Sequence, residues 1–200
     1  MKKIHSVARP FLALIFGSLL LLLDLNGLQS TGAGLALAII GIIFAIYYLV
    51  AGLLGLIVNE KMPQKGRQTL EVIAVSLFPV YLFVGTLMIV IANAQTMGPT
   101  GWIINILSLA AFLMFVIFYL LGIFVDNKVI KKLVFLFAAI MGLAFILSFV
   151  FDINGNQVII GNLPIASLAM YAVYGNILIG GVMRLGKDEQ KAEEPPVREE

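Results

Sequence analysis

The sequence contains no cysteine and a single histidine, His5. The lack of cysteine excludes disulfides, thiolate metal sites, a cysteine nucleophile and a lipid anchor on cysteine. With one histidine, a zinc site of the familiar ligand types cannot be built either, so no metal and no cofactor are expected. His5 precedes the first apolar run among basic residues, and no partner for a catalytic base is apparent, which favours a solvated interfacial side chain.

Charge is also scarce. Only 12% of the 200 residues are charged and 61% are hydrophobic, whereas an ordinary soluble domain has about 25% charged and roughly 45–50% apolar residues. A water-soluble core could not hide that much apolar surface, so the composition predicts an all-α integral membrane protein surrounded by a lipid bilayer. The formal net charge is +2, and the basic residues form small clusters rather than one patch, so nucleic acid is not an expected partner.

Six apolar runs divide the chain. Each is close to the length that a helix needs to cross a bilayer, about 20 residues. Together they predict one six-span transmembrane domain, residues 1–185, and the charged segment 186–200 is expected to be a disordered cytoplasmic tail. The runs cover residues 10–28, 34–58, 70–94, 103–125, 133–151 and 161–185.

The first run has a second interpretation. Its strictly apolar part, residues 11–23, is short for a span and resembles the hydrophobic region of a signal peptide, with weak cleavage features at residues 30–33. Asp24 and Asn26 fit such a cleavage site poorly. We therefore expect the first run to be retained as a span.

The basic residues predict the orientation. If the N-terminus is cytoplasmic and all six runs cross the membrane, all 13 Lys and Arg fall on the cytoplasmic side, as the positive-inside rule requires. The sequence therefore predicts that both termini are cytoplasmic, with the plasma membrane as the expected location. The four clusters are Lys2, Lys3 and Arg9; Lys61, Lys65 and Arg67; Lys128, Lys131 and Lys132; and Arg184, Lys187, Lys191 and Arg198.

Two extracytoplasmic loops resemble each other. Asp24 and Asn26 in the first loop have counterparts in Asp152 and Asn154 in the other, and a glycine follows the asparagine in both loops. One interpretation is a helix end, because Asn and Gly tolerate the left-handed conformation and Asp bonds nearby amides. The other is that these four residues form a polar site for a solute or cation. The spacing lacks the later ligands of a calcium loop, so no calcium site is predicted.

Few polar residues lie inside the runs. Asp24 is placed near the outer boundary of the first span, where a carboxylate is tolerated but costs free energy. Asn105 and Asn176 are candidate intramembrane polar residues, with hydrogen bonding between helices or the lining of a polar cavity as their alternative roles. Pro79 interrupts the third run, and neighbouring helices or hydroxyls are expected to satisfy the carbonyl that it frees.

The second run carries small residues at alternating steps of four and three. This spacing puts them on one face of a helix, where another helix can approach closely. Packing within the chain is favoured over dimerisation, since every helical core needs such contacts. The face comprises Gly34, Ala38, Gly41, Ala45, Tyr48, Gly52 and Gly55.

No motif of a known enzyme chemistry is present: nucleophile elbows, phosphate loops and metalloprotease helices are all missing from the sequence. The chain is therefore expected to be non-enzymatic. The first hypothesis is an accessory or assembly subunit that binds a membrane-protein partner or a second copy of itself. The alternative is a solute-binding or transport component with its polar site on the extracytoplasmic side.

Overall fold

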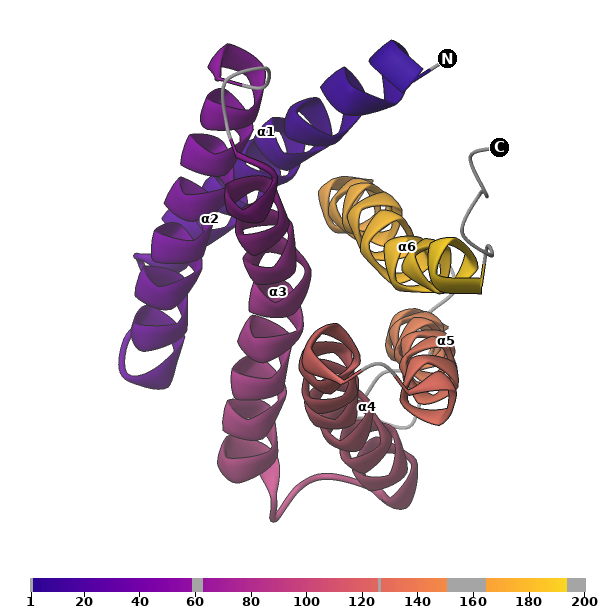
Figure 1. Ribbon diagram of the computed structural model, residues 1–200. Coiled ribbons are helices and arrows are strands. Elements are labelled where there is room, and N and C mark those ends of the chain that lie inside the picture. Colours follow the sequence, from indigo (N-terminus) through magenta and orange to yellow (C-terminus); the bar gives the residue numbers. More distant parts are fainter. Residues whose placement is uncertain (1, 59–62, 126, 151–164, 194–200) are drawn as a thin grey trace, which may run out of the picture.

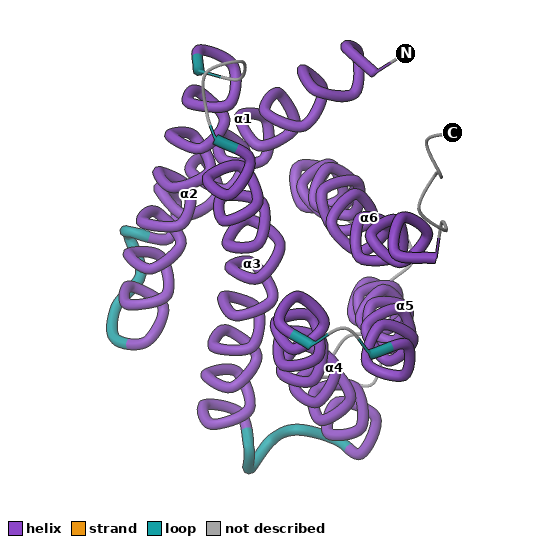
Figure 2. Tube along the Cα trace, viewed as in Figure 1, coloured by secondary structure: helices purple, strands orange, loops and turns teal. Residues whose placement is uncertain are grey.

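The computed structural model describes residues 2–58, 63–125, 127–150 and 165–193. In these residues the chain forms six α-helices and no strand (Figure 1, Figure 2), which confirms the prediction of an all-α protein. The helices are α1 (Lys2–Gly27), α2 (Ala33–Ile57), α3 (Gln64–Asn93), α4 (Pro99–Phe124), α5 (Lys128–Val150) and α6 (Ile165–Glu193).

Four stretches in these helices are long and apolar enough to cross a membrane: Arg9–Gly27, Ala33–Ile57, Gly66–Asn93 and Pro99–Phe124. A shorter apolar stretch, Ala169–Met183, lies in α6. Several helices extend beyond the apolar runs, because helical hydrogen bonding continues into the polar flanks. α6 continues to Glu193, into the segment expected to be a disordered tail.

Short turns join α1 to α2 and α3 to α4, and local chemistry sets several helix ends. Gly32, before α2, has a φ of 58°, a left-handed conformation that glycine adopts without steric cost. Pro99 occupies the first turn of α4, where a missing N–H breaks no hydrogen bond. Asn127 caps α5, since its Oδ1 accepts a hydrogen bond from the Val129 N–H at 2.8 Å.

The six helices form a closed ring. Each helix packs on the next one along the chain, and α6 returns to pack on α1 (Figure 1). α6 also contacts α3 and α4 across the ring. The most extensive contacts are those of α1 with α2 and of α4 with α5, while α3 connects these two hairpins through α2 and α4. α3 therefore has neighbours on several sides and is central to the packing.

The two faces of α2 differ: one is exposed and apolar, and the other packs inside the bundle. Its outward face carries the exposed residues Ile39, Ile43, Ile46, Val50 and Leu53. Soluble monomers rarely expose contiguous apolar patches of this kind, and such a face matches contact with lipid chains. The opposite face of α2 carries small residues and points into the bundle.

An aromatic cluster fills the junction of α1, α2, α3 and α6. It consists of Phe16, Tyr48, Phe78 and Tyr174, which are all buried. Ring centroids lie 4.5 Å apart for Phe78 and Tyr174, and 4.6 Å apart for Phe16 and Tyr48. Such pairs contribute about 0.5–1.5 kcal/mol beyond the burial of their surface, so one residue from each helix fixes how the four helices meet.

Pro79 lies inside α3 and has no N–H to donate to the Val75 carbonyl one turn earlier. The Tyr174 hydroxyl of α6 donates to this carbonyl at 2.7 Å. From α2, the Tyr48 hydroxyl donates to the adjacent Ala74 carbonyl. The expectation that a hydroxyl of a neighbouring helix satisfies the freed carbonyl is confirmed by Tyr174, which ties α3 to α6 at the break. Tyr48 adds a link to α2 at a carbonyl whose helical donor, the Phe78 N–H, Pro79 does not remove.

The replacement Tyr174→Phe tests this tie. Removing the hydroxyl leaves the Val75 carbonyl buried without a donor, and we expect the free energy of unfolding to fall by about 1–2 kcal/mol. The loss should shrink in a Pro79→Ala background, because an alanine at this position supplies the missing backbone N–H. Denaturant unfolding in mixed micelles measures both values as a double-mutant cycle.

Tyr47→Phe is the matched control for this cycle. The Tyr47 hydroxyl donates to the Leu70 carbonyl at 3.0 Å. This carbonyl keeps its helical donor, because Pro79 lies further along α3. Its removal should therefore cost the same free energy whether or not the proline is replaced. An equal cost of Tyr174→Phe in both backgrounds would contradict the proposed repair of the break.

Candidate functional site

Asp24 is the one acidic side chain that the described part of the chain buries in its apolar interior. It lies on α1 where this helix meets α2 and α3, and only 7% of its surface is exposed. The Tyr81 hydroxyl of α3 donates to Asp24 Oδ1 at 2.8 Å. Asp24 Oδ2 is also buried, and no group among the described residues forms a hydrogen bond with it.

Gly41 of α2 makes room for this carboxyl group. A Cβ atom at position 41 would overlap Asp24 Oδ2, so any larger residue would have to displace the aspartate or the helix. The carboxyl group thus packs directly on the α2 backbone. Its second oxygen lies against Gly41 and has no hydrogen-bond donor among the described residues.

The rest of the small face of α2 also lies against α1. Ala38 packs on Gly27, Gly52 packs on Leu14, and Pro10 reaches both Gly52 and Gly55. The middle of the face, including Ala45, is buried, while Gly34 at the start of α2 is exposed. The face is therefore covered by a helix of the same chain.

Asp24 lies deeper in the bundle than its place near the end of α1 suggests. Gly27, the last residue of α1, packs against Ala38, which is well inside α2. Tyr81, the partner of Asp24, precedes the end of α3 at Asn93 by about 18 Å at 1.5 Å per residue. The end of α1 is recessed relative to α2 and α3, which puts the carboxyl group level with the middle of α3.

Aromatic rings surround the hydrogen bond between Asp24 and Tyr81. The Tyr81 ring stacks on Phe78 with a centroid distance of 6.1 Å, and its edge contact with Phe44 has the same distance. Such walls screen charge poorly, since they provide no polar groups. A charged carboxylate here costs roughly 2.5–3.5 kcal/mol on insertion scales for a helix centre.

The residues predicted to share a solute site with Asp24 do not surround it. Asn26 is exposed, on a different side of α1 from Asp24. Asp152 and Asn154 lie outside the described residues. Among the residues that the structure describes, Asp24 is instead paired with Tyr81. This contact joins α1 to α3, and no pattern in the sequence around either residue predicts it.

The two asparagines within the spans have different surroundings. Asn105 is 2% exposed, and its amide donates to the Gly101 carbonyl at 2.8 Å and contacts the Met97 sulfur at 3.4 Å. It therefore links the start of α4 to the preceding loop. Asn176 is exposed on α6 and donates to the Ala172 carbonyl of its own helix at 2.9 Å.

No cluster of three or more potential metal ligands occurs within the described ranges. Comparison with models of protein families, with curated proteins and with solved structures gave no match. The geometry of the site is that of a buried carboxyl group with one tyrosine donor. Its second oxygen has no hydrogen-bond partner within the described part of the chain.

Gly41→Ala tests how closely the carboxyl group packs on α2. The added methyl group would overlap Asp24 Oδ2, and we expect the free energy of unfolding to fall by about 1–3 kcal/mol. Asp24→Ala removes the obstructing atoms, so Gly41→Ala should cost much less in that background. Gly142→Ala is the control, because a Cβ atom there meets nothing within 4 Å. Equal costs of Gly41→Ala in the two backgrounds would show that the glycine is needed for another reason.

Proposed function

We propose that the chain is a six-span protein of the plasma membrane, with both termini cytoplasmic, and that it acts as a proton-binding component of membrane transport. The observation that carries this proposal is the burial of Asp24 with one oxygen lacking a hydrogen bond. Ionisable groups inside a membrane domain are costly and are commonly associated with substrate pathways and proton relays.

A proton fits this site better than a metal cation or an organic solute. A sodium or calcium ion needs several oxygen ligands around it, whereas the described residues contain no cluster of carboxylates around Asp24, and Tyr81 provides its one hydrogen-bonding side chain there. A proton needs no coordination shell. When it binds Oδ2, the carboxylate becomes a neutral carboxylic acid and the cost of a buried charge disappears.

The tyrosine gives the site two distinct states. When Asp24 is ionised, the Tyr81 hydroxyl provides its one hydrogen bond. When Asp24 holds a proton, the helices close around a neutral pair. Release of the proton requires water or a base to reach Oδ2, and the tight contact of α1 with α2 at Gly41 must open for this to happen. Proton binding and the packing of α1 on α2 are thereby linked.

A second candidate function is an accessory or assembly subunit, and Asn176 favours it. This amide lies on an exposed face of α6 together with Ile179 and Met183, which are also exposed. An amide directed at lipid is unfavourable, and a helix of a partner protein could accept hydrogen bonds from it. Under this hypothesis Asn176→Leu should release a co-purified partner that Asp24→Asn retains.

The proposed topology is tested with single cysteines, which can be introduced one at a time because the chain has none of its own. Gln29→Cys and Thr96→Cys lie in the two described loops that the topology places outside, and Lys132→Cys lies on the cytoplasmic side. In intact cells a membrane-impermeant maleimide should label the first two, and it should reach Lys132→Cys only after permeabilisation. Labelling of Lys132→Cys in intact cells would rule out the proposed orientation.

Dicyclohexylcarbodiimide tests proton binding, because it adds to protonated carboxyl groups in apolar surroundings. The acid proton passes to a carbodiimide nitrogen while the carboxylate oxygen bonds to its carbon. We expect labelling of the Asp24 peptide that decreases as the pH rises, since only the protonated form reacts. Asp24→Asn should abolish it. The peptide carrying Glu71, which pairs with Arg9, serves as the internal control and should remain unmodified.

Proteoliposomes distinguish the two candidate functions. With an imposed pH gradient and a potassium ionophore to balance charge, the wild-type protein should dissipate the gradient faster than Asp24→Asn at equal protein content. Equal rates for the two proteins would contradict a transport role and leave the accessory role. Labelling that does not change with pH would contradict proton binding at Asp24.

A further inference from the structure

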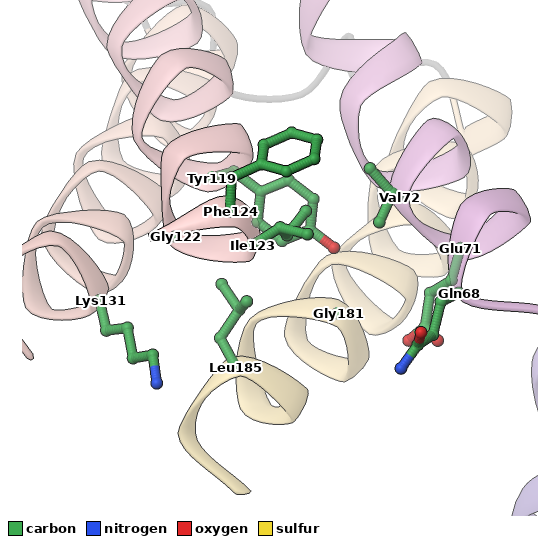
Figure 3. A pocket seen from close by; sticks show the side chains of 10 residues that line it. All are labelled: Gln68, Glu71, Val72, Tyr119, Gly122, Ile123, Phe124, Lys131, Gly181 and Leu185. Carbon is green, nitrogen blue, oxygen red and sulfur yellow. The ribbon is translucent and has the colours of Figure 1, made fainter. Parts of the chain in front are cut away.

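A cavity of about 320 Å³ lies between α3, α4, α5 and α6, far along α3 from Asp24. It is at the end of the bundle where α3 and α5 begin and α4 ends (Figure 3). Two glycines in its wall, Gly122 of α4 and Gly181 of α6, contribute no side chain to fill it. Its volume is at the lower end of the range of small-molecule sites.

A lysine provides the basic group in the lining of this cavity. Lys131, in the first turn of α5, lines the cavity and is only 6% exposed, an unusual degree of burial for a lysine. The Glu71 carboxylate lies on the opposite wall and is bound by Arg9, whose Nη1 donates to Glu71 Oε1 at 2.8 Å. Glu71 therefore already has a cationic partner on α1.

The apolar part of the lining continues to the outside of the bundle. Phe124, the last residue of α4, lines the cavity and is 82% exposed. Leu185 of α6 lies between the Lys131 and Glu71 sides in Figure 3, and Ile123 adds to the same apolar surface. The cavity therefore combines a buried cation with an apolar edge that opens beside the bundle.

We propose that this cavity binds the phosphate-bearing head group of an anionic phospholipid. The phosphate would approach Lys131, and the acyl chains would leave along Phe124 toward the bilayer. Basic pockets between membrane helices on the cytoplasmic side are recognised sites for anionic head groups. A soluble phosphate compound shares the same charged chemistry, but it would gain nothing from the exposed apolar edge.

The site does not depend on the proposed role of Asp24. It shares α3 with the contact between Asp24 and Tyr81, but its α3 residues lie earlier in that helix, at Gln68, Glu71 and Val72, and its other walls come from α4, α5 and α6. Its failure and the failure of proton binding are therefore separable, because the experiments use different ligands and different variants.

Native mass spectrometry of the full chain in mild detergent tests the proposal. The wild-type protein is titrated with phosphatidylglycerol and, separately, with phosphatidylcholine of the same acyl chains. Loss of one basic contact near a membrane surface corresponds to about a fivefold loss of affinity. Lys131→Gln should therefore bind phosphatidylglycerol at least about fivefold more weakly, whereas its binding of phosphatidylcholine should not change.

Lys132→Gln is the matched control. It removes the same charge from the adjacent residue, which is exposed and does not line the cavity. It should leave phosphatidylglycerol binding within about twofold of the wild type, as expected for a surface charge. Equal losses in the two variants would show general attraction to a basic surface and would overturn the site.

Two further measurements use the wild-type protein alone and do not require Lys131→Gln to fold. In the wild-type protein, phosphatidylglycerol should bind more tightly than phosphatidylcholine, and equal binding of the two lipids would overturn the proposal. Inorganic phosphate and glycerol 3-phosphate are added as competitors. If either displaces the lipid at a concentration comparable to that of the lipid, the site takes a soluble phosphate and the lipid assignment is wrong.

Discussion

The Val75 carbonyl is the group around which the bundle is arranged. Pro79 leaves it without its helical donor, and inside a membrane no water can replace that donor. Tyr174 meets the requirement from α6, and Tyr48 binds the neighbouring Ala74 carbonyl from α2. A covalent feature of α3 thus creates the requirement that α6 meets, which explains how α6 comes to lie across the ring against α3.

The same region of α3 then determines the surroundings of Asp24. Tyr81 follows Pro79 by half a turn and faces α1, where its hydroxyl reaches the carboxyl group. Phe78 packs against both Tyr174 and Tyr81, so the repaired break and the carboxyl site share one aromatic wall. The rigidity that secures the Val75 carbonyl also holds Tyr81 in position.

Hydropathy predicted the helical elements because it depends on short stretches of sequence. The spacing of small residues in α2 is also a local property, and in the structure Gly41 and Gly52 lie against α1. The partners of polar groups were not predictable in this way. The contact of Asp24 with Tyr81 depends on the recessed end of α1. The burial of Lys131 depends on the packing of α5 with its neighbours. Both follow from contacts between residues far apart in the sequence.

The two polar regions, the carboxyl site and the basic cavity, share α3 but contact different neighbours of it. Glu71 and Val72 face the cavity near the beginning of α3, and Tyr81 faces Asp24 beyond the proline. Coupling between distant sites requires a connecting element with two discrete arrangements. The proline break in α3 lies between them, and side-chain hydroxyls from other helices span it. A hydroxyl can exchange its acceptor without unfolding a helix, whereas a backbone hydrogen bond cannot. The Tyr174 hydrogen bond to the Val75 carbonyl, together with the packing of Val75 on Gly181 in the cavity wall, is therefore where a head group in the cavity could influence protonation of Asp24.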